Sequence, residues 1–388
     1  MNRSFALCRN IGKKLFLFCM TLAMISFSGC QFSSWIEEKT SGNAVTDTPN
    51  GNGEGTTVGD LTGNPSTPSF PSDNPLDGSV GALYRHPLTG ALTNEAISRT
   101  RPIAVCLGNT SSSMPQYGLS SASVLIEAPV EGGSTRLMAL SCDYASVACY
   151  GSIRSTRDYL ESLASSFDAI SVHAGNSDNG EAANYQKSDP LDYISQNLTN
   201  TFYRDPSRQS PHNLMTSGAL IAMAIDDAGY RATSAPILPY RIALQHSAVT
   251  SRAYSASRID IPFSSLYRAN FIYHSETGQY QYMRYQNDSV HGDERSSTQL
   301  TYRNLILLFA DSVSSVTQGG NGVLTVNLNG EGTGLFCCAG MATDIVWRVS
   351  EDGIVTCYDT QGASLSADIG NTYIAIVKTS LLANVSVE

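Results

Sequence analysis

The sequence predicts an α/β (α+β) N-terminal domain followed by a mostly antiparallel β C-terminal domain, with a disordered segment before both. Three observations favour this fold class. Short apolar runs alternate with stretches of helical spacing in residues 83–238, β-rich runs separated by Gly, Asn, Asp and Ser turns fill residues 239–388, and residues 31–82 show no hydrophobic period. Strands that alternate with helices are typical of an α/β layer, and short strands with frequent turns are typical of antiparallel sheets.

The composition is that of a soluble globular protein with an acidic balance. Of the 388 residues, 41% are hydrophobic and 15% are charged, and the formal net charge is −10. Because nucleic-acid phosphates require a basic face on the protein, this balance argues against a nucleic-acid partner. A local basic pocket is still compatible with it.

Residues 1–30 are predicted to be a lipoprotein signal peptide. Four basic residues without an acid precede the apolar run Leu15–Phe27, which is shorter than the roughly 20 residues of a stable membrane span. The run ends in Phe27-Ser28-Gly29-Cys30, which resembles the lipobox of bacterial lipoproteins. The prediction is therefore a lipid on Cys30 that holds the protein at the extracytoplasmic face of the cell membrane. A simple secretory signal and an uncleaved anchor are the alternatives.

Residues 31–82 are rich in Gly, Pro, Ser, Thr and Asn. Such a segment buries too little apolar surface to offset its ordering entropy, so we expect a disordered tether. A flexible chain of this length reaches roughly 40 Å.

The N-terminal domain, residues 83–238, contains both strand and helix patterns. Apolar and β-branched runs predict strands over 102–107, 124–128, 135–140, 146–150 and 170–173. Helical spacing predicts a helix over 153–167 capped by Ser152 or Ser155, a short helix over 190–197, and a helix from about Ser217 to Ala228 that stops at Gly229. In the C-terminal domain, residues 239–388, two pairs of runs flank Glu276-Thr277-Gly278 and Glu351-Asp352-Gly353, which predicts two hairpins.

Polar residues follow several apolar runs, and this places a candidate ligand site where strands end. The turn from Tyr150 to Arg157 carries Arg154 and Arg157, which would lie on the first turn of the predicted helix and could clamp a carboxylate or phosphate. A structural role for these arginines, bridging to Asp158, Glu161 or a facing carboxylate, is equally compatible with the sequence. The full set of predicted ligand-binding residues is Glu127, Arg136, Ser152, Arg154, Arg157, His173 and His212. A second polar and aromatic loop contains residues 202–205 and Arg208.

No standard signature of an enzyme, cofactor site or metal site is present in the sequence. We find no GxSxG, SxxK, HExxH, P-loop or GxGxxG motif, so neither a cofactor nor a metal ion is expected. The catalytic candidates, if any exist, are His173 and Glu127 as general bases. Six cysteines follow Cys30 without zinc spacing, and Cys142 with Cys149 could close a disulfide in an oxidising compartment.

Several motifs in one order resemble the YerB-like lipoproteins, a bacterial family of unknown function with N- and C-terminal parts. They include "HPLTG" (86–90), "SVLIEAPVEGGSTRLMAL" (123–140), "GSIRSTRDY" (151–159), "DAISVHAG" (168–175) and "PHNLMTS" (211–217), and the resemblance covers nearly everything after residue 83. It implies an envelope lipoprotein with two domains. It supplies no catalytic residue, and residues 106–109 depart from the family pattern.

The leading functional hypothesis is a membrane-anchored protein that binds an anionic or peptide-like component of the cell envelope through a pocket in the N-terminal domain. One alternative is a hydrolase or transferase that modifies the cell wall with His173 or Glu127 as general base. Another is a scaffold that presents the β domain to an envelope protein. The partners expected are thus the membrane, through the lipid on Cys30, and a wall component or envelope protein.

Overall fold

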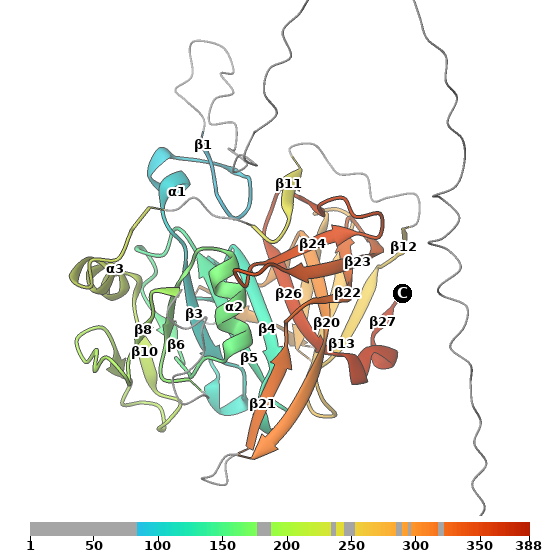
Figure 1. Ribbon diagram of the computed structural model, residues 1–388. Helices are drawn as coiled ribbons and strands as arrows, with labels where there is room; N and C mark the ends of the chain where they lie inside the picture. Colours follow the sequence, from blue (N-terminus) through green and yellow to red (C-terminus); the bar gives the residue numbers. More distant parts are fainter. Residues whose placement is uncertain are drawn as a thin grey trace, which may run out of the picture. The chain divides into compact units, whose positions relative to one another are not determined.

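The computed structural model is built around one mixed 12-stranded sheet (Figure 1). The structure describes residues 84–176, 188–233, 238–243, 253–284, 289–293, 296–316 and 322–388, and these all lie within one compact unit. The predicted signal peptide, Cys30 and the predicted tether lie outside the described residues. No helix in the described part of the chain is long and apolar enough to cross a membrane.

The central sheet combines strands from both halves of the chain. Its order is β12 (Tyr254–Ser255), β23 (Met341–Val349), β22 (Glu331–Cys338), β20 (Asn304–Val316), β26 (Thr372–Lys378), β4 (Val124–Pro129), β5 (Thr135–Ser141), β3 (Ile103–Gly108), β7 (Ile170–His173) and β8 (Leu191–Asp192). β21 (Gly322–Asn327) pairs with β20, and β24 (Val355–Asp359) pairs with β23. The halves meet where β26 runs parallel to β4, with Thr372 opposite Val124 and Ala375 opposite Glu127.

Apolar side chains cover both faces of this sheet, because the central strands are buried on both sides. One face, with Ile126 and Met138, packs against α2 (Asp158–Ser166) through Tyr159, Leu160 and Leu163. Figure 1 shows α2 lying in front of β3, β4 and β5. We call this the α2 face.

The opposite face, with Leu125 and Leu137, packs against α3 (Gly218–Asp227) and a second sheet. This six-stranded antiparallel sheet consists of β16 (Ser289–Val290), β15 (Gln279–Arg284), β14 (Arg268–His274), β13 (Arg258–Pro262), β27 (Ser386–Val387) and β19 (Thr301–Tyr302). We call this the tyrosine face, because Tyr280, Tyr282, Tyr302 and Tyr373 are all buried in its core.

Small elements complete the described fold. They are β1 (Tyr84–Arg85) with β2 (Leu92–Thr93), α1 (Glu95–Arg99), β6 (Tyr150–Gly151) with β10 (Leu214–Thr216) and β9 (Tyr203–Arg204), β11 (Arg241–Ala243) with β25 (Ser366–Asp368), and β17 (Gly292–Asp293) with β18 (Thr298–Gln299).

The predicted fold class is confirmed, with a mixed layer of strands and helices first and a β-rich part after it. β7 has the predicted bounds, β4 and β5 each extend one residue beyond theirs, and β3 is shifted by one residue at both ends. α3 is capped by Ser217, whose Oγ accepts a hydrogen bond from Leu220 N. Both hairpins are present, as β14 with β15 and as β23 with β24.

Three local predictions were wrong. The helix predicted from residue 153 begins at Asp158, because Ile153 N donates to Leu214 O and Arg154 N donates to Cys106 O, which keeps this segment extended. The helix predicted over 190–197 is absent, since residues 191–192 pair with β7 as β8 and the chain then turns. The strand predicted over 146–150 is reduced to β6, which starts at Tyr150.

The cysteines in the described part of the chain are all buried free thiols. Cys142 and Cys149 are among them, so no disulfide joins them in this structure. Burial raises the pKa of the Cys106 thiol to about 11, which keeps it protonated at neutral pH.

Candidate functional site

The predicted site residues divide between the two faces of the central sheet. Along β5, Arg136 lies on the α2 face with Met138, whereas Thr135 and Leu137 lie on the tyrosine face. Along β4, Glu127 lies on the tyrosine face with Leu125. Because successive side chains of a strand point to opposite faces, Glu127 and Arg136 cannot line a common pocket.

Arg136 is a buried cation that forms no ion pair with a carboxylate among the residues that the structure describes. Only 7% of the residue is exposed, and its Nε atom has no hydrogen-bond partner among the described residues. No hydrogen bond or ion pair joins its guanidinium to any other residue in the described part of the chain. Burial, and then the nearby charges of Arg157 and Arg154, lower the pKa of Arg136 to about 10, although Cys106 and the Glu131 carboxylate act in the opposite direction. An arginine held in this way at the end of a strand is a candidate for binding an anion.

The extended segment before α2 brings Arg154 to the same place. Arg136 lies opposite Gly108 at the end of β3, and a Cβ atom on Gly108 would lie 3.1 Å from Cγ of Arg154. The absence of a side chain at Gly108 therefore leaves room for the arginine stem. Arg154 Nη1 donates to Pro211 O at 3.0 Å, and no carboxylate pairs with it among the described residues. The two predicted arginines thus do not lie on a helical turn as expected.

The loop that carries His212 adds two more basic groups. His212 Nδ1 lies 3.1 Å from Ser113 Oγ, and Arg208 Nη2 donates to the carbonyl oxygens of Ser113 and Pro115 at 2.8 and 2.9 Å. Partial burial, and then the charges of Arg154, Arg136 and Arg208, lower the pKa of His212. This shift indicates that the four side chains are electrostatic neighbours. We call Arg136, Arg154, Arg208 and His212 the basic cluster.

Arg208, a member of the basic cluster, and Ser113, which bonds His212, could not be assigned to the site from the sequence. Arg208 was visible only as part of a polar loop, and Ser113 gave no signal at all. Ser152, which was predicted, is fully buried on the segment before α2, and its Oγ atom has no partner.

Arg157, in contrast, is neutralised by an acidic residue. Its Nε atom donates to both carboxylate oxygens of Glu131 at 3.0 and 3.1 Å, and Nη2 also bonds this carboxylate. Glu131 Oε1 accepts a further bond from Leu324 N at 3.0 Å. Burial favours the neutral acid, but the Arg157 and Leu324 bonds outweigh it and hold the pKa of Glu131 below its ordinary value. The pair therefore fastens the N-terminal part of the fold to β21, the structural alternative raised by the sequence.

Glu127 is enclosed in the tyrosine face. Its carboxylate accepts hydrogen bonds from Tyr282 Oη at 2.5 Å and Tyr373 Oη at 2.8 Å, and from Thr135 Oγ1 and Asn109 Nδ2 at 2.7 and 3.1 Å. Only 2% of the residue is exposed, and burial raises the pKa of this carboxyl group. Glu127 therefore joins the two halves of the fold and does not face solvent.

His173 lies on the α2 face but is also fully buried. Its Nδ1 atom lies 3.1 Å from Gly175 O and 3.6 Å from a carboxylate oxygen of Asp192. A general base must reach its substrate within hydrogen-bond distance. In this structure neither His173 nor Glu127 is open to one.

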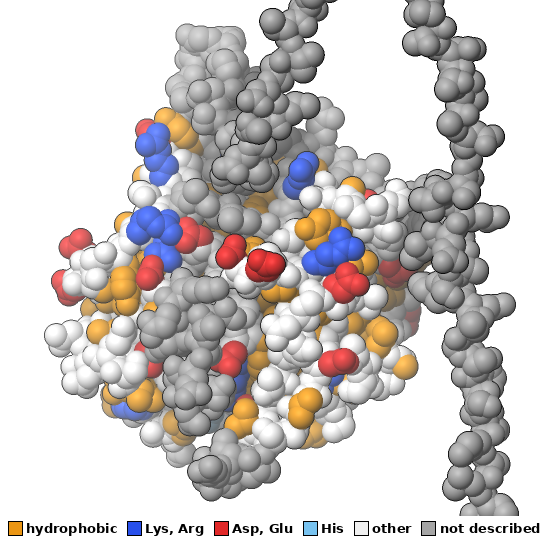
Figure 2. Space-filling view, in the orientation of Figure 1, with side chains coloured by type: hydrophobic (Ala, Val, Ile, Leu, Met, Phe, Trp, Pro, Cys, Tyr) orange, Lys and Arg blue, Asp and Glu red, His pale blue; other side chains and the backbone are white. Residues whose placement is uncertain are grey.

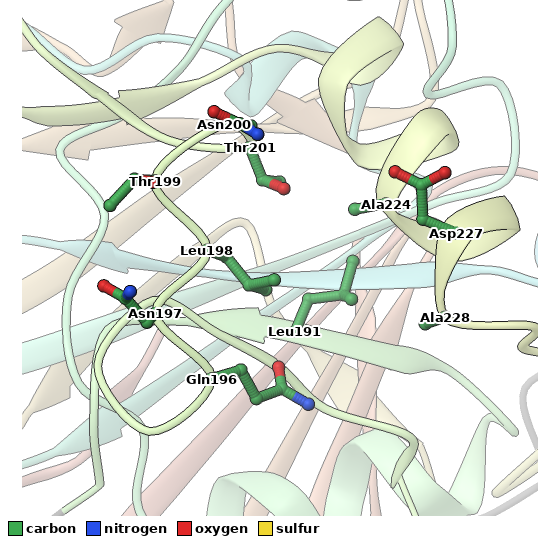
Figure 3. Close-up of a pocket in the computed structure, with 10 residues that line it drawn as sticks. All are labelled: Leu191, Gln196, Asn197, Leu198, Thr199, Asn200, Thr201, Ala224, Asp227 and Ala228. Carbon is green, nitrogen blue, oxygen red and sulfur yellow. The ribbon is translucent and has the colours of Figure 1, made fainter.

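Other polar features lie away from the basic cluster. A pocket of about 290 Å³ has Leu191, Leu198 and Ala224 facing its centre and amides around its rim (Figure 3). A second pocket, of about 230 Å³, lies beside Trp347. Neither is lined by a predicted site residue, and no group of His, Cys, Asp or Glu suited to a metal ion occurs in the described part of the chain.

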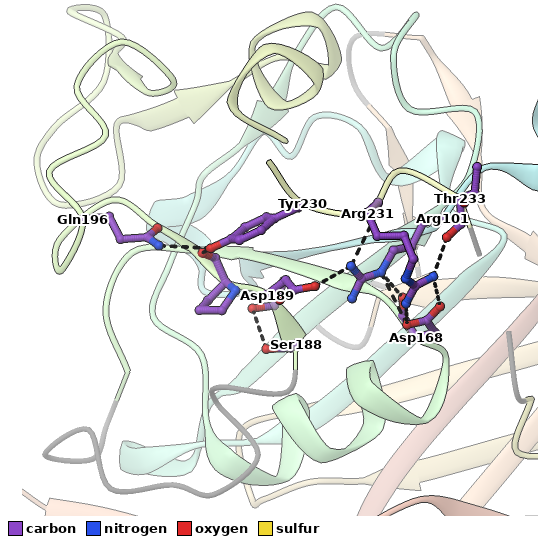
Figure 4. Close-up of polar contacts among 10 residues, drawn as sticks. Arg101, Asp168, Ser188, Asp189, Gln196, Tyr230, Arg231 and Thr233 are labelled. Atoms are coloured by element: carbon purple, nitrogen blue, oxygen red, sulfur yellow. Dashed lines mark hydrogen bonds and ion pairs between the residues drawn. The ribbon is translucent and has the colours of Figure 1, made fainter. Parts of the chain in front are cut away.

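Ion pairs and hydrogen bonds join the segments that precede β3, β7 and β8 to the segment that follows α3. The buried guanidinium of Arg101 bonds Asp168 O at 2.8 Å and Asp189 Oδ2 at 2.5 Å, while Arg231 pairs with the Asp168 carboxylate (Figure 4). Elsewhere, basic side chains form small separate groups among acidic and neutral ones on the face shown in Figure 2. The buried Arg101 is thus paired with carboxylates, whereas the similarly buried Arg136 pairs with none among the described residues.

The comparisons with known proteins agree on the family. Residues 88–231 match the family described as "Protein of unknown function (DUF3048) N-terminal domain", and residues 259–374 match its "C-terminal domain". "Putative lipoprotein YerB" of Bacillus subtilis (strain 168) is 27% identical over 306 residues, which is 77% of this chain and 88% of that protein. The crystal structure of YerB from Bacillus subtilis is 24% identical, has a TM-score of 0.67 and covers 78% of this chain and 99% of its own, which supports the same fold. The chain belongs to the DUF3048 family of YerB-like proteins and carries its N- and C-terminal domains in that order.

Proposed function

We propose that this protein is an extracytoplasmic lipoprotein, anchored to the membrane through Cys30, whose basic cluster binds an anionic group of a cell-envelope component. The name of its Bacillus subtilis relative and the sequence Phe27-Ser28-Gly29-Cys30 support the anchor. The observation that carries the binding function is that the buried Arg136 forms no ion pair with a carboxylate among the described residues.

The energetic argument starts from the cost of burying a charge. Taking a guanidinium out of water costs several kcal/mol unless an anion or a set of acceptors compensates it. Arg101 shows the compensated arrangement in the same fold, with two aspartates and a carbonyl group around it. Arg136 lacks such partners, so an anionic ligand would supply the missing compensation. Bidentate bonding from a guanidinium would also orient a carboxylate or phosphate.

The binding proposal is tested by measuring the affinity of the purified protein for anionic envelope fragments by calorimetry. Arg136→Met should abolish binding or weaken it at least about tenfold, since a charge-assisted hydrogen bond contributes about 1.5–3 kcal/mol. Arg99→Met is the matched control, because the Arg99 side chain is 67% exposed and, among the described residues, forms an ion pair with Glu95 alone. Equal affinities of wild type and Arg136→Met would refute the proposal.

The anchor is tested separately in cells. Labelling with a fatty-acid precursor should mark the wild-type protein and leave Cys30→Ser unmarked and released from the membrane. Retention of the label in Cys30→Ser would contradict lipidation at this cysteine.

A further inference from the structure

We infer that the basic cluster accepts a doubly charged phosphoryl group, such as the end of a phosphate monoester, in preference to a carboxylate or a phosphodiester. This inference rests on the proposed anion-binding function and narrows its ligand class.

The first argument is the number of charges that the ligand must balance. Arg136, Arg154 and Arg208 have no carboxylate within ion-pair distance among the described residues, whereas Arg157 is neutralised by Glu131. A carboxylate or a phosphodiester carries one negative charge and would leave most of this positive charge unbalanced. A phosphate monoester carries close to two at pH 7.5, because its second pKa is about 6.

The second argument is the arrangement of the donors along the chain. Arg136 comes from β5, Arg154 from the extended segment before α2, and His212 from the loop before β10. Arg154 and Ser113 meet at Gly108, where a Cβ atom would lie 2.3 Å from Ser113 Oγ and 3.1 Å from Arg154 Cγ. Ser113 in turn bonds His212. Donors from three segments suit a tetrahedral group better than a planar carboxylate, which one guanidinium can satisfy alone.

The third argument concerns the protonation of His212. The charged groups around it come from β5 (Arg136), the segment before α2 (Arg154) and its own loop (Arg208), and all three disfavour the imidazolium. A bound dianion would reverse this effect, because an opposite charge within about 4–6 Å favours the charged form. Binding should therefore be accompanied by partial proton uptake at His212.

The test compares small anions that differ in charge but little in size. Calorimetry at pH 7.5 and constant ionic strength measures the affinities for methyl phosphate, dimethyl phosphate, acetate and inorganic phosphate. We expect methyl phosphate to bind at least about tenfold more tightly than dimethyl phosphate or acetate, since one additional charge acts on cations at close range. Comparable affinities for inorganic phosphate and methyl phosphate would support a site that leaves the ester-bearing oxygen of the ligand facing solvent. If inorganic phosphate binds tenfold more tightly than methyl phosphate, the assignment to a phosphate monoester is overturned.

Sulfate isolates the contribution of His212, because sulfate remains a dianion from pH 8 to pH 5.5. Its affinity should rise as the pH falls in wild type and stay constant in His212→Gln. An identical pH dependence in both proteins would remove His212 from the site.

The outcomes separate this inference from the function on which it rests. Equal affinities for acetate, dimethyl phosphate and methyl phosphate would overturn the phosphoryl preference while leaving an anion site. No binding of any anion to the wild-type protein would overturn both. The wild-type comparison needs no variant, so it stands even if Arg136→Met fails to fold.

Discussion

Glu127 gives the sharpest prediction about stability, because one carboxylate connects four segments of the fold. In Glu127→Ala, the hydroxyl groups of Tyr373 and Thr135 lose their acceptor, and Tyr282 and Asn109 each lose one bond. An unsatisfied buried donor costs about 1–3 kcal/mol. We therefore expect the free energy of unfolding to fall by about 3–6 kcal/mol, a large fraction of the 5–15 kcal/mol typical of a domain.

Glu127→Gln is the matched control, because it keeps the shape and one acceptor oxygen. Its amide nitrogen can donate to a tyrosine oxygen, so we expect a loss of only about 1–2 kcal/mol. Urea unfolding followed by the fluorescence of the buried Trp347 measures both variants. The reasoning fails if Glu127→Ala costs less than about 1 kcal/mol, or if the two variants are equally destabilised.

The pH dependence follows from the raised pKa of Glu127. The folded state holds this proton more tightly than the unfolded state, so the stabilising contribution is fully present below the unfolded pKa of about 4.5. It is lost as the pH rises toward the folded pKa, with a slope of up to about 1.4 kcal/mol per pH unit. Relative to Glu127→Gln, wild type should therefore lose stability from pH 4.5 upward. A difference that stays constant with pH would show that Glu127 ionises normally.

Two further predictions concern the frame around the site. Arg157→Met should destabilise the protein by about 3 kcal/mol, since it leaves the partly buried Glu131 without its partner. Arg348→Met, at an exposed ion pair, is the control and should cost less than about 1 kcal/mol. Equal shifts of the urea midpoint in the two variants would contradict this prediction. Gly218→Ala should lower the melting temperature by several degrees, because its Cβ atom would lie 1.6 Å from Tyr144 O, and Gly322→Ala, with open space around it, should change little.

Most strands could be predicted from the sequence because their apolar runs are continuous. β3, β4 and β5 are buried on both faces, and each contains a continuous apolar run, residues 103–107, 124–126 and 137–140. The same property hid the division of the site. With both faces apolar, the sequence of β4 and β5 does not reveal that Glu127 and Arg136 lie on opposite faces of the sheet.

The segment 150–157 shows why local patterns failed at the site itself. The helical spacing predicted over 153–167 includes its second half, but Ile153 and Arg154 donate their backbone hydrogen bonds to Leu214 and Cys106, which lie far away in the sequence. Tertiary pairing thus overrides helical propensity there. Arg208 lies in the loop between β9 and β10, and the pairing of these two strands places it beside the basic cluster. No residue spacing in the sequence predicts that placement.

The shared central sheet leads to a last prediction, that the N-terminal half does not fold alone. A chain that ends at residue 238 lacks β26, so the edge of β4 loses its parallel partner, and Glu127 loses both tyrosines. The tyrosine face would also expose Leu125 and Leu137 to water. Residues 83–238 expressed alone should therefore lack near-ultraviolet circular dichroism and cooperative unfolding, and coexpression with residues 239–388 should restore both. A sharp unfolding transition of the isolated half would mean that the continuous sheet is not required, and that the two family regions are independent folding units.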